Sequence, residues 1–203
     1  MVGMYMKPVV LLFTCLALPA ATLAAEAPTR ILVAYHSETG NTEGLAKAVR
    51  AGAASVPGVE ALLRKVADAT SDEIVNADGI LLGTPVYWGS LTPEAKSFLD
   101  RAGNTLMKAR KTAGDGRTAG AFCTGGGVAM GKDLARLAII SAFLVMRFTV
   151  IGGVDAEGYG TLGPEATTGS ADPGLSEKEL EEARRFGERF ARLTRQIRSN
   201  MKN

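Results

Sequence analysis

The chain has few of the side chains that most protein active sites and metal sites use. Its 203 residues include one histidine, His36, and two cysteines, Cys15 and Cys123. A Ser-His-Asp triad needs its histidine beside a serine, a Cys-His pair needs both groups together, and zinc sites need three or four such ligands. The sequence therefore gives poor support to nucleophilic catalysis of these kinds, and we expect no metal site.

Clusters of like charge are also missing. The formal net charge is +2, to which Lys7 contributes one unit, and no patch rich in Lys or Arg occurs. Nucleic acid is therefore not an expected partner. Cys123 is the only cysteine after residue 25, so we expect no internal disulfide and a stability that comes from the core. The chain length and a composition of 46% hydrophobic and 22% charged residues fit one ordinary globular domain.

Residues 1–25 have the pattern of a secretory signal peptide. Lys7 forms a short basic region, residues 8–18 are apolar, and Pro19 precedes the small residues 22–25. Cleavage after Ala24 or Ala25 would leave residues 26–203 as a single domain in an exported, periplasmic protein. The alternative is an uncleaved segment that anchors the chain in a membrane, because residues 8–25 are nearly long enough to span one.

Strand and helix patterns alternate from Arg30 onward. We expect strands at 30–36, 59–65, 79–82, 119–123 and 148–151, and helices at 42–54, 92–101, 132–145 and 176–198, with at most one helical turn in 67–76. Residues 103–117 and 152–174 read as loops, and the helix at 132–145 is apolar enough to be packed on both sides. Such alternation predicts an α/β fold of the flavodoxin-like type, a doubly wound five-stranded parallel sheet with helices on both faces.

The turn after the first expected strand has the composition of an anion site. Ser37, Thr39 and Thr42 can offer hydroxyl groups, and Gly40 lacks the Cβ that would keep the backbone away from a phosphate. The turn leads into a helix, whose first N–H groups and dipole favour negative charge. Because the turn contains no Lys or Arg, it predicts the phosphate site of flavin mononucleotide (FMN) more than that of a nucleoside triphosphate.

Two more turns should meet this one, because the carboxyl ends of parallel strands share one edge of the sheet. In the first of them, Tyr87 and Trp88 are adjacent between Pro85 and Gly89. An aromatic side chain can stack on the flat isoalloxazine ring of a flavin, and glycine lets the backbone approach the ring edge. In the second, residues 124–127 are a threonine and three glycines, which leave bare backbone for another edge of the ring. The alternatives are an ordinary polar turn and an aromatic pair that only fills a hydrophobic gap.

Residues 126–133 nearly match the nucleotide-binding pattern G-x-x-x-x-G-K-[ST]. Asp133 replaces the hydroxyl residue, and an acid there would repel phosphates, so this is a weak alternative. Lys132 is then expected to serve a cofactor phosphate or to be solvated. We expect Cys123 to be a small core residue and His36 to be a packing or loop residue.

With these turns in place, the chain resembles the flavodoxin-like NAD(P)H:quinone oxidoreductases of the WrbA type, and more loosely the NADPH-dependent FMN reductases. The resemblance covers about residues 31–193 and is strongest at 37–42, 83–90, 96–101 and 124–127. It implies noncovalently bound FMN, electron transfer from NAD(P)H to quinones, and homodimers or homotetramers. The residues that it implies as contacts of FMN are Ser37, Thr39, Gly40, Asn41, Thr42, Pro85, Val86, Tyr87, Trp88, Gly89, Ser90, Thr124, Gly125 and Gly126.

The sequence thus predicts an FMN-dependent oxidoreductase that passes two electrons from NAD(P)H to a quinone or a similar acceptor. The first alternative is a flavodoxin-type electron carrier without substrate turnover of its own. Residues 39–42 are closer to flavodoxins than to WrbA proteins, but the weak net charge argues against a carrier, since carrier flavodoxins are usually strongly acidic. The second alternative is a binding module that has lost the cofactor, against which the intact first turn argues.

Overall fold

The computed structural model describes residues 1–3, 27–109, 114–154, 161–169 and 171–201, so most of the predicted signal peptide lies outside the described residues. The elements follow one another as β1 (Thr29–Tyr35), α1 (Asn41–Ala54), β2 (Val59–Lys65), α2 (Ser71–Asn76), β3 (Gly79–Pro85), α3 (Pro93–Ala109), β4 (Thr118–Gly125), α4 (Lys132–Val145), β5 (Thr149–Val150), β6 (Glu165–Thr167) and α5 (Glu177–Asn200). No helix in this part of the chain is both long and apolar enough to cross a membrane.

All of these strands pair in parallel, in the order β2-β1-β3-β4-β5, and β6 pairs with the second half of β4. The inner strands β1, β3 and β4 are buried almost without interruption. Continuous burial is what a parallel sheet covered on both faces requires. The structure confirms the predicted doubly wound, flavodoxin-like fold.

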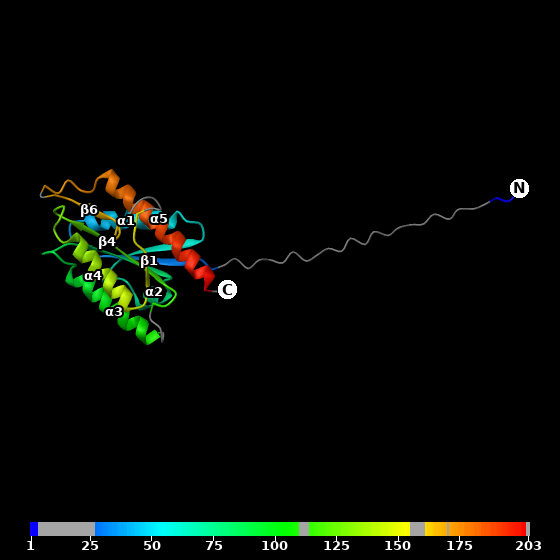
Figure 1. The fold of residues 1–203 in the computed structure, drawn as a ribbon, viewed down its shortest axis with the longest axis horizontal. Coiled ribbons are helices and arrows are strands. Elements are labelled where there is room, and N and C mark those ends of the chain that lie inside the picture. The colour runs from blue at the N-terminus through cyan, green and yellow to red at the C-terminus, as the bar shows by residue number, and fades with distance from the viewer. Residues whose placement is uncertain (4–26, 110–113, 155–160, 170, 202–203) are drawn as a thin grey trace.

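Helices cover both faces of the sheet (Figure 1). Phe186 and Phe190 of α5 lie in one hydrophobic core with residues of α1. Phe98 of α3 and Phe143 of α4 lie in a second core on the opposite face. The sheet thus separates two apolar layers and supports the turns at its carboxyl edge.

Several expected element boundaries were wrong. The third helix does not end near Arg101 but reaches Ala109, because Leu106 continues its buried stripe. The expected loop at 152–174 contains β6, which pairs with β4 through backbone hydrogen bonds and adds a sixth strand. The fifth strand, expected at 148–151, has only two residues, Thr149–Val150.

The helix expected to be packed on both sides, α4, is packed on one side only. Ala135, Ile139 and Phe143 are buried against the sheet. Large apolar side chains on the outer face of α4 are exposed.

Candidate flavin site

The three turns predicted from the sequence follow β1, β3 and β4, which are neighbours in the sheet. Tyr35 is in register with Gly83, and Pro85 with Thr124, so the strands end close together. The chain leaves β1 toward β2 on one side, while β3 lies on the other side of β1. Such a reversal of strand order opens a crevice at the carboxyl ends of the strands.

The first turn presents the start of α1 without a side-chain cap. Gly40 is the N-cap residue with a left-handed φ of 95°, and nothing lies within 4 Å of the place where a Cβ would stand. The Thr42 hydroxyl is buried and lies 2.7 Å from that of Thr124, which ties this turn to the end of β4. The Asn41 amide donates to Thr39 Oγ1 over 3.1 Å. An uncapped helix start with open space and hydroxyls beside it is suited to a phosphate.

The second turn is a tight backbone loop that exposes its aromatic side chains. The N–H of Tyr87 donates to the Ser90 carbonyl over 3.1 Å, and the reverse bond is 3.2 Å. Trp88 and Gly89 between them have φ values of 53° and 81°. A left-handed tryptophan is strained by about 1–2 kcal/mol. Trp88 is fully exposed and Tyr87 partly so, which leaves two ring faces available to a ligand.

The third turn provides a smooth backbone surface. A Cβ on Gly126 would meet nothing within 4 Å, whereas a Cβ on Gly125 would come within 3.1 Å of the Lys132 side chain. The N–H of Val86 donates to the Thr124 carbonyl over 2.8 Å, so the second and third turns are joined directly. Gly126 therefore leaves backbone facing open space at one wall of the crevice, whereas Gly125 leaves room for the Lys132 side chain.

These turns line one cleft of about 180 Å³. The predicted residues on its wall are Ser37, Thr39, Asn41, Thr42, Pro85, Val86, Tyr87, Thr124, Gly125 and Gly126. Gly40, Trp88, Gly89 and Ser90 shape the turns without lining the cleft. The volume is smaller than the roughly 300 Å³ of an enclosed ligand pocket, as expected of an open groove. Uncapped N–H groups, hydroxyls, bare glycine backbone and an aromatic side chain together fit FMN.

A fourth wall of the cleft was missed from the sequence. It consists of Thr168, Gly169 and Asp172, and Glu38 also lines the cleft. The N–H of Thr168 donates to the Gly125 carbonyl over 3.0 Å, directly after β6. Nothing in the glycine-rich run 152–174 marks these residues, since their position depends on the pairing of β6 with β4.

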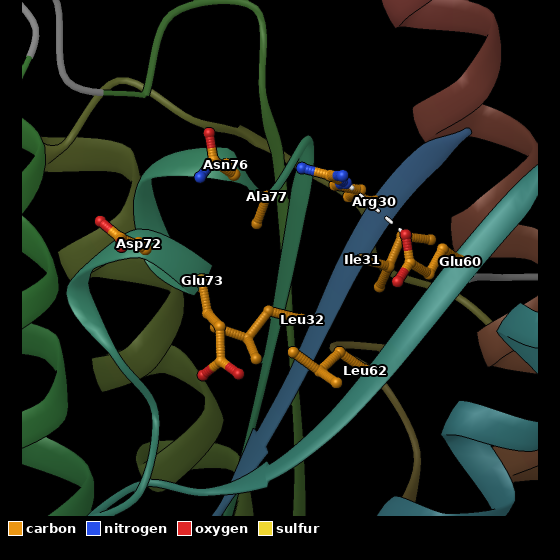
Figure 2. Close-up of a pocket in the computed structure, with 9 residues that line it drawn as sticks. All are labelled: Arg30, Ile31, Leu32, Glu60, Leu62, Asp72, Glu73, Asn76 and Ala77. Atoms are coloured by element: carbon orange, nitrogen blue, oxygen red, sulfur yellow. Dashed lines mark ion pairs between the residues drawn. The ribbon is translucent and has the colours of Figure 1, made fainter. Parts of the chain in front are cut away.

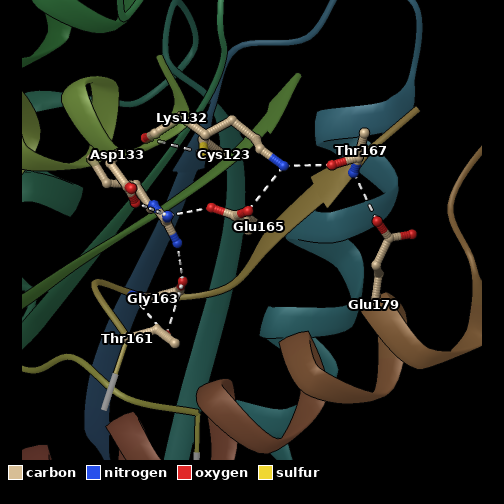
Figure 3. A network of polar contacts seen from close by, with 9 residues as sticks. Cys123, Lys132, Asp133, Thr161, Gly163, Glu165, Thr167 and Glu179 are labelled. Atoms are coloured by element: carbon tan, nitrogen blue, oxygen red, sulfur yellow. Dashed lines mark hydrogen bonds and ion pairs between the residues drawn. The ribbon is translucent and has the colours of Figure 1, made fainter. Parts of the chain in front are cut away.

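An ionic network with two buried cations lies behind the third turn (Figure 3). Lys132 is 3% exposed, and its Nζ lies 2.9 Å from Glu165 Oε1 and also contacts Thr167 Oγ1. Arg136 contacts the other oxygen of Glu165 and lies 2.5 Å from Asp133 Oδ1. Lys132 is therefore neither solvated nor directed toward a ligand phosphate, and the nucleotide-loop alternative is wrong.

The two other residues singled out from the sequence lie close to the cleft. Nε2 of His36 is 3.7 Å from carboxylate oxygens of both Glu38 and Glu94, and it has no hydrogen-bond partner among the described residues. Burial, together with the carboxylates of Glu38 and Glu94, raises the pKa of the Tyr87 phenol, which is therefore neutral at ordinary pH. Cys123 is buried in β4, as expected, and burial raises the pKa of its thiol to about 12.

A second hollow, of about 200 Å³, lies at the opposite end of the sheet (Figure 2). It is floored by Leu32 and Leu62 and bordered by Arg30 and Glu60, whose side chains approach to 3.6 Å. The hollow exists because α2 has only six residues and leaves this part of β1 and β2 partly uncovered. It contains none of the predicted site residues.

Comparison with known proteins agrees with this geometry. Residues 63–157 match the family described as NADPH-dependent FMN reductase. The chain is 33% identical over 162 residues to a flavodoxin of Aquifex aeolicus, covering 80% of this chain and 85% of that protein. It is 26% identical over 205 residues to an NAD(P)H dehydrogenase (quinone) of Solidesulfovibrio magneticus, covering 83% of this chain and 99% of that protein. The structure of a WrbA-like flavodoxin from Agrobacterium tumefaciens superposes with a TM-score of 0.65 at 26% identity, covering 83% of this chain and 99% of that one.

The fold and the cleft define a flavodoxin-like flavoprotein. The chain belongs to the FMN-binding flavodoxin-like family that includes the WrbA-type NAD(P)H:quinone oxidoreductases. This confirms the resemblance drawn from the sequence and the expected cofactor.

Proposed function

We propose that this protein is an FMN-dependent oxidoreductase that transfers two electrons from NAD(P)H to a quinone or a similar small acceptor. The observation that carries the proposal is the open cleft in which an uncapped helix start, an exposed aromatic turn and a bare glycine turn converge. The relatives described as NAD(P)H dehydrogenase (quinone) support the choice of donor and acceptor.

Each wall of the cleft has a separate task in this proposal. The first N–H groups of α1, with the hydroxyls of Ser37, Thr39 and Thr42, would hold the phosphate. Tyr87 would contact the isoalloxazine ring, and Gly126 would leave space at its edge. FMN, when bound, supplies the redox chemistry, taking up two electrons from one substrate and giving them to the next. The protein orients the substrates, and because the cleft is open, donor and acceptor can occupy the same place in turn.

The alternative of an electron carrier is supported by the relatives described as flavodoxins, one of which is 33% identical. A net charge of +2 favours the enzyme, because a carrier that docks on redox partners by charge needs a strong field of one sign. Steady-state oxidation of NADH and NADPH by the FMN-loaded full chain, with and without a water-soluble benzoquinone, separates the two. We expect quinone-dependent turnover with at least one of the nicotinamides. Tight FMN binding without turnover would instead identify a carrier.

We also propose that the protein is exported, with cleavage near Ala24. Support comes from the sequence pattern of residues 1–25. Reduced nicotinamides are scarce outside the cytoplasm, so an exported enzyme would need another source of electrons, such as a membrane quinol. N-terminal sequencing of the protein from its native compartment decides between cleavage and retention.

We further propose that two copies associate through the outer face of α4. Its apolar stripe, defined here as Leu134, Leu137, Leu144 and Val145, is exposed and contains no charge. Val128, Met130 and Trp88 are exposed near the start of the helix, where the Gly131 and Gly89 backbones approach so closely that a Cβ on Gly131 would clash. Monomeric proteins rarely expose so many large apolar side chains together. An uncharged stripe can face its own copy across a two-fold axis without like-charge repulsion.

A further inference from the structure

The cleft assigned to FMN has an unusual charge for a site that receives a phosphate. The residues that line it include two carboxylates, Glu38 and Asp172, and no Lys or Arg. The Glu38 carboxylate lies 3.7 Å from His36 Nε2. Asp172 lies elsewhere, at the start of α1 where the phosphate is expected.

Asp172 already accepts a hydrogen bond from one of the donors of the proposed phosphate site. The amide of Asn41, the first residue of α1, donates to Asp172 Oδ1 over 2.8 Å. The same amide is oriented by Thr39, another residue of the phosphate turn. The carboxylate of Asp172 thus lies where a bound anion would accept hydrogen bonds from the start of α1.

The backbone holds Asp172 in this place. Asp172 has a left-handed φ of 43°, a conformation that Asp and Asn adopt more readily than other residues with a side chain. The segment that contains Asp172 begins at Thr168, bonded to Gly125, and ends at Ser176, which caps α5. These contacts on either side of Asp172, together with its hydrogen bond from Asn41, place the carboxylate at the start of α1.

Both anchors depend on carboxylates that Figure 3 shows, those of Glu165 and Glu179. Glu165 of β6 is held by Lys132 and Arg136 from α4. The Thr167 N–H donates to Glu179 Oε1 over 2.7 Å, and Glu179 also completes the capping box of Ser176. The ionic network and the start of α5 together fix the position of the wall that carries Asp172.

We propose that Asp172 is a specificity-determining residue of the flavin cleft, because its carboxylate occupies the anion position beside Asn41 and lowers the preference of the site for FMN over riboflavin, which lacks the phosphate. The inference rests on the flavin cleft of the proposed function. The phosphate must displace this carboxylate from Asn41 or remain close to a like charge, and either process costs affinity. Riboflavin has no phosphate, so it neither displaces the carboxylate nor is repelled by it.

The test is a fluorescence titration of the flavin-free full chain with FMN and, separately, with riboflavin. Asp172→Asn keeps a side-chain acceptor for Asn41 and tolerates left-handed φ, while it removes the charge. We expect the ratio of the riboflavin Kd to the FMN Kd to rise about tenfold, the size of one like-charge contact at an exposed site. The riboflavin Kd should stay within about twofold of the wild-type value. The rise in the ratio of the two dissociation constants should be smaller in high salt.

Two further variants serve as a control and a check. Glu188→Gln removes one negative charge from α5 away from the cleft and should leave both dissociation constants unchanged. Asp172→Gly removes the carboxylate and relieves the left-handed strain, so it should raise the ratio in the same way as Asp172→Asn.

An unchanged or lower ratio in both Asp172 variants would overturn the proposal, because the carboxylate would then be neutral toward the phosphate or helpful to it. A wild-type chain that binds neither flavin would overturn the cleft and the role of Asp172 together. Normal flavin binding without quinone turnover would remove only the proposed reaction and leave the role of Asp172 intact.

Discussion

At the scale of single residues, Cys123 shows how burial removes a reactive group from the chemistry of the site. Its thiol lies in β4 directly before the third turn, and its Sγ donates to the Lys132 carbonyl over 3.6 Å. Burial raises its pKa to about 12, so the thiol stays protonated at neutral pH. Thiolate is the nucleophilic form, and Cys123 therefore has neither the ionisation nor the access for redox work.

We expect Cys123 in the folded protein to resist iodoacetamide at pH 7.5. The reaction should be at least about a thousandfold slower than in urea, because both the thiolate fraction and the accessibility fall on folding. Mass spectrometry of the peptide that contains Cys123, at timed intervals, measures the rate. Rapid modification in the folded state, at a rate close to that in urea, would show that β4 opens easily or that the thiol is activated.

The sequence predicted those residues of the cleft wall that lie in short turns directly after strands. Ser37, Thr42, Tyr87 and Thr124 could be placed because parallel strands bring their carboxyl ends together. Asp172 could not be placed in this way, because it is 131 residues from Asn41 in the sequence. It comes close to Asn41 only because ion pairs hold β6 beside β4. Pairings of this kind between distant charged residues leave no local pattern in a sequence.

At the scale of elements, the packing of α1 against α5 depends on two glycines that are ordinary in sequence. A Cβ on Gly52 would lie 1.8 Å from the Arg184 carbonyl oxygen, and a Cβ on Gly187 would lie 1.9 Å from that of Val49. Each helix therefore contacts the backbone of the other, and no side chain can be inserted without moving one of them. These helices form the layer behind β1 and fix the start of α1, where we propose that the phosphate binds.

Gly187→Ala should destabilise the protein by about 2–3 kcal/mol or more, since the added methyl meets backbone that cannot rotate away. Gly103→Ala is the matched control within helix α3, where the nearest atom to the new Cβ would be the Met146 sulfur at 3.5 Å. That variant should stabilise the protein by up to about 1 kcal/mol, because alanine favours the helix. Urea unfolding followed by circular dichroism measures both changes, and equal effects in the two variants would contradict the packing argument.

Element ends and irregular strands were the parts of the fold that sequence patterns predicted poorly. Gly103 suggested the end of a helix, yet α3 continues because its buried stripe gains more from Leu106 than glycine costs. The three residues of β6 have no strand pattern of their own and take their conformation from β4. In both cases contacts from another element outweigh local preference.

At the scale of the whole molecule, the two ends of the sheet differ in what they can bind. The carboxyl end carries three joined turns, uncapped helix N–H groups and exposed aromatic side chains. The hollow at the other end has a leucine floor and an ion pair at its border, and no strand-to-helix turn of the kind found at the carboxyl end lines it in the described residues. Position relative to strand direction, rather than size, therefore distinguishes the candidate functional site.

The outer face of α4 begins next to this site and extends along one side of the molecule. We expect the wild-type protein to sediment at about twice its chain mass of 21.2 kDa. Leu137→Glu and Leu144→Glu should each shift it to the monomer, because a carboxylate buried against an apolar copy loses its hydration without gaining a partner. A loss of about 2–4 kcal/mol, typical of a central interface residue, would weaken the dimer by roughly 30- to 1,000-fold.

The matched control for these variants is Met201→Glu, which introduces the same charge at an exposed apolar residue just after α5. It should leave the dimer intact. Sedimentation velocity over a range of protein concentrations distinguishes the species, and flavin binding measured in parallel shows that each variant is folded. A wild-type chain that stays monomeric, or glutamate variants of α4 that stay dimeric, would contradict association through this face. Because Trp88 and Met130 lie at its border, a true dimer would place a second copy beside the flavin cleft, and loss of the dimer should then also alter the KM for the quinone.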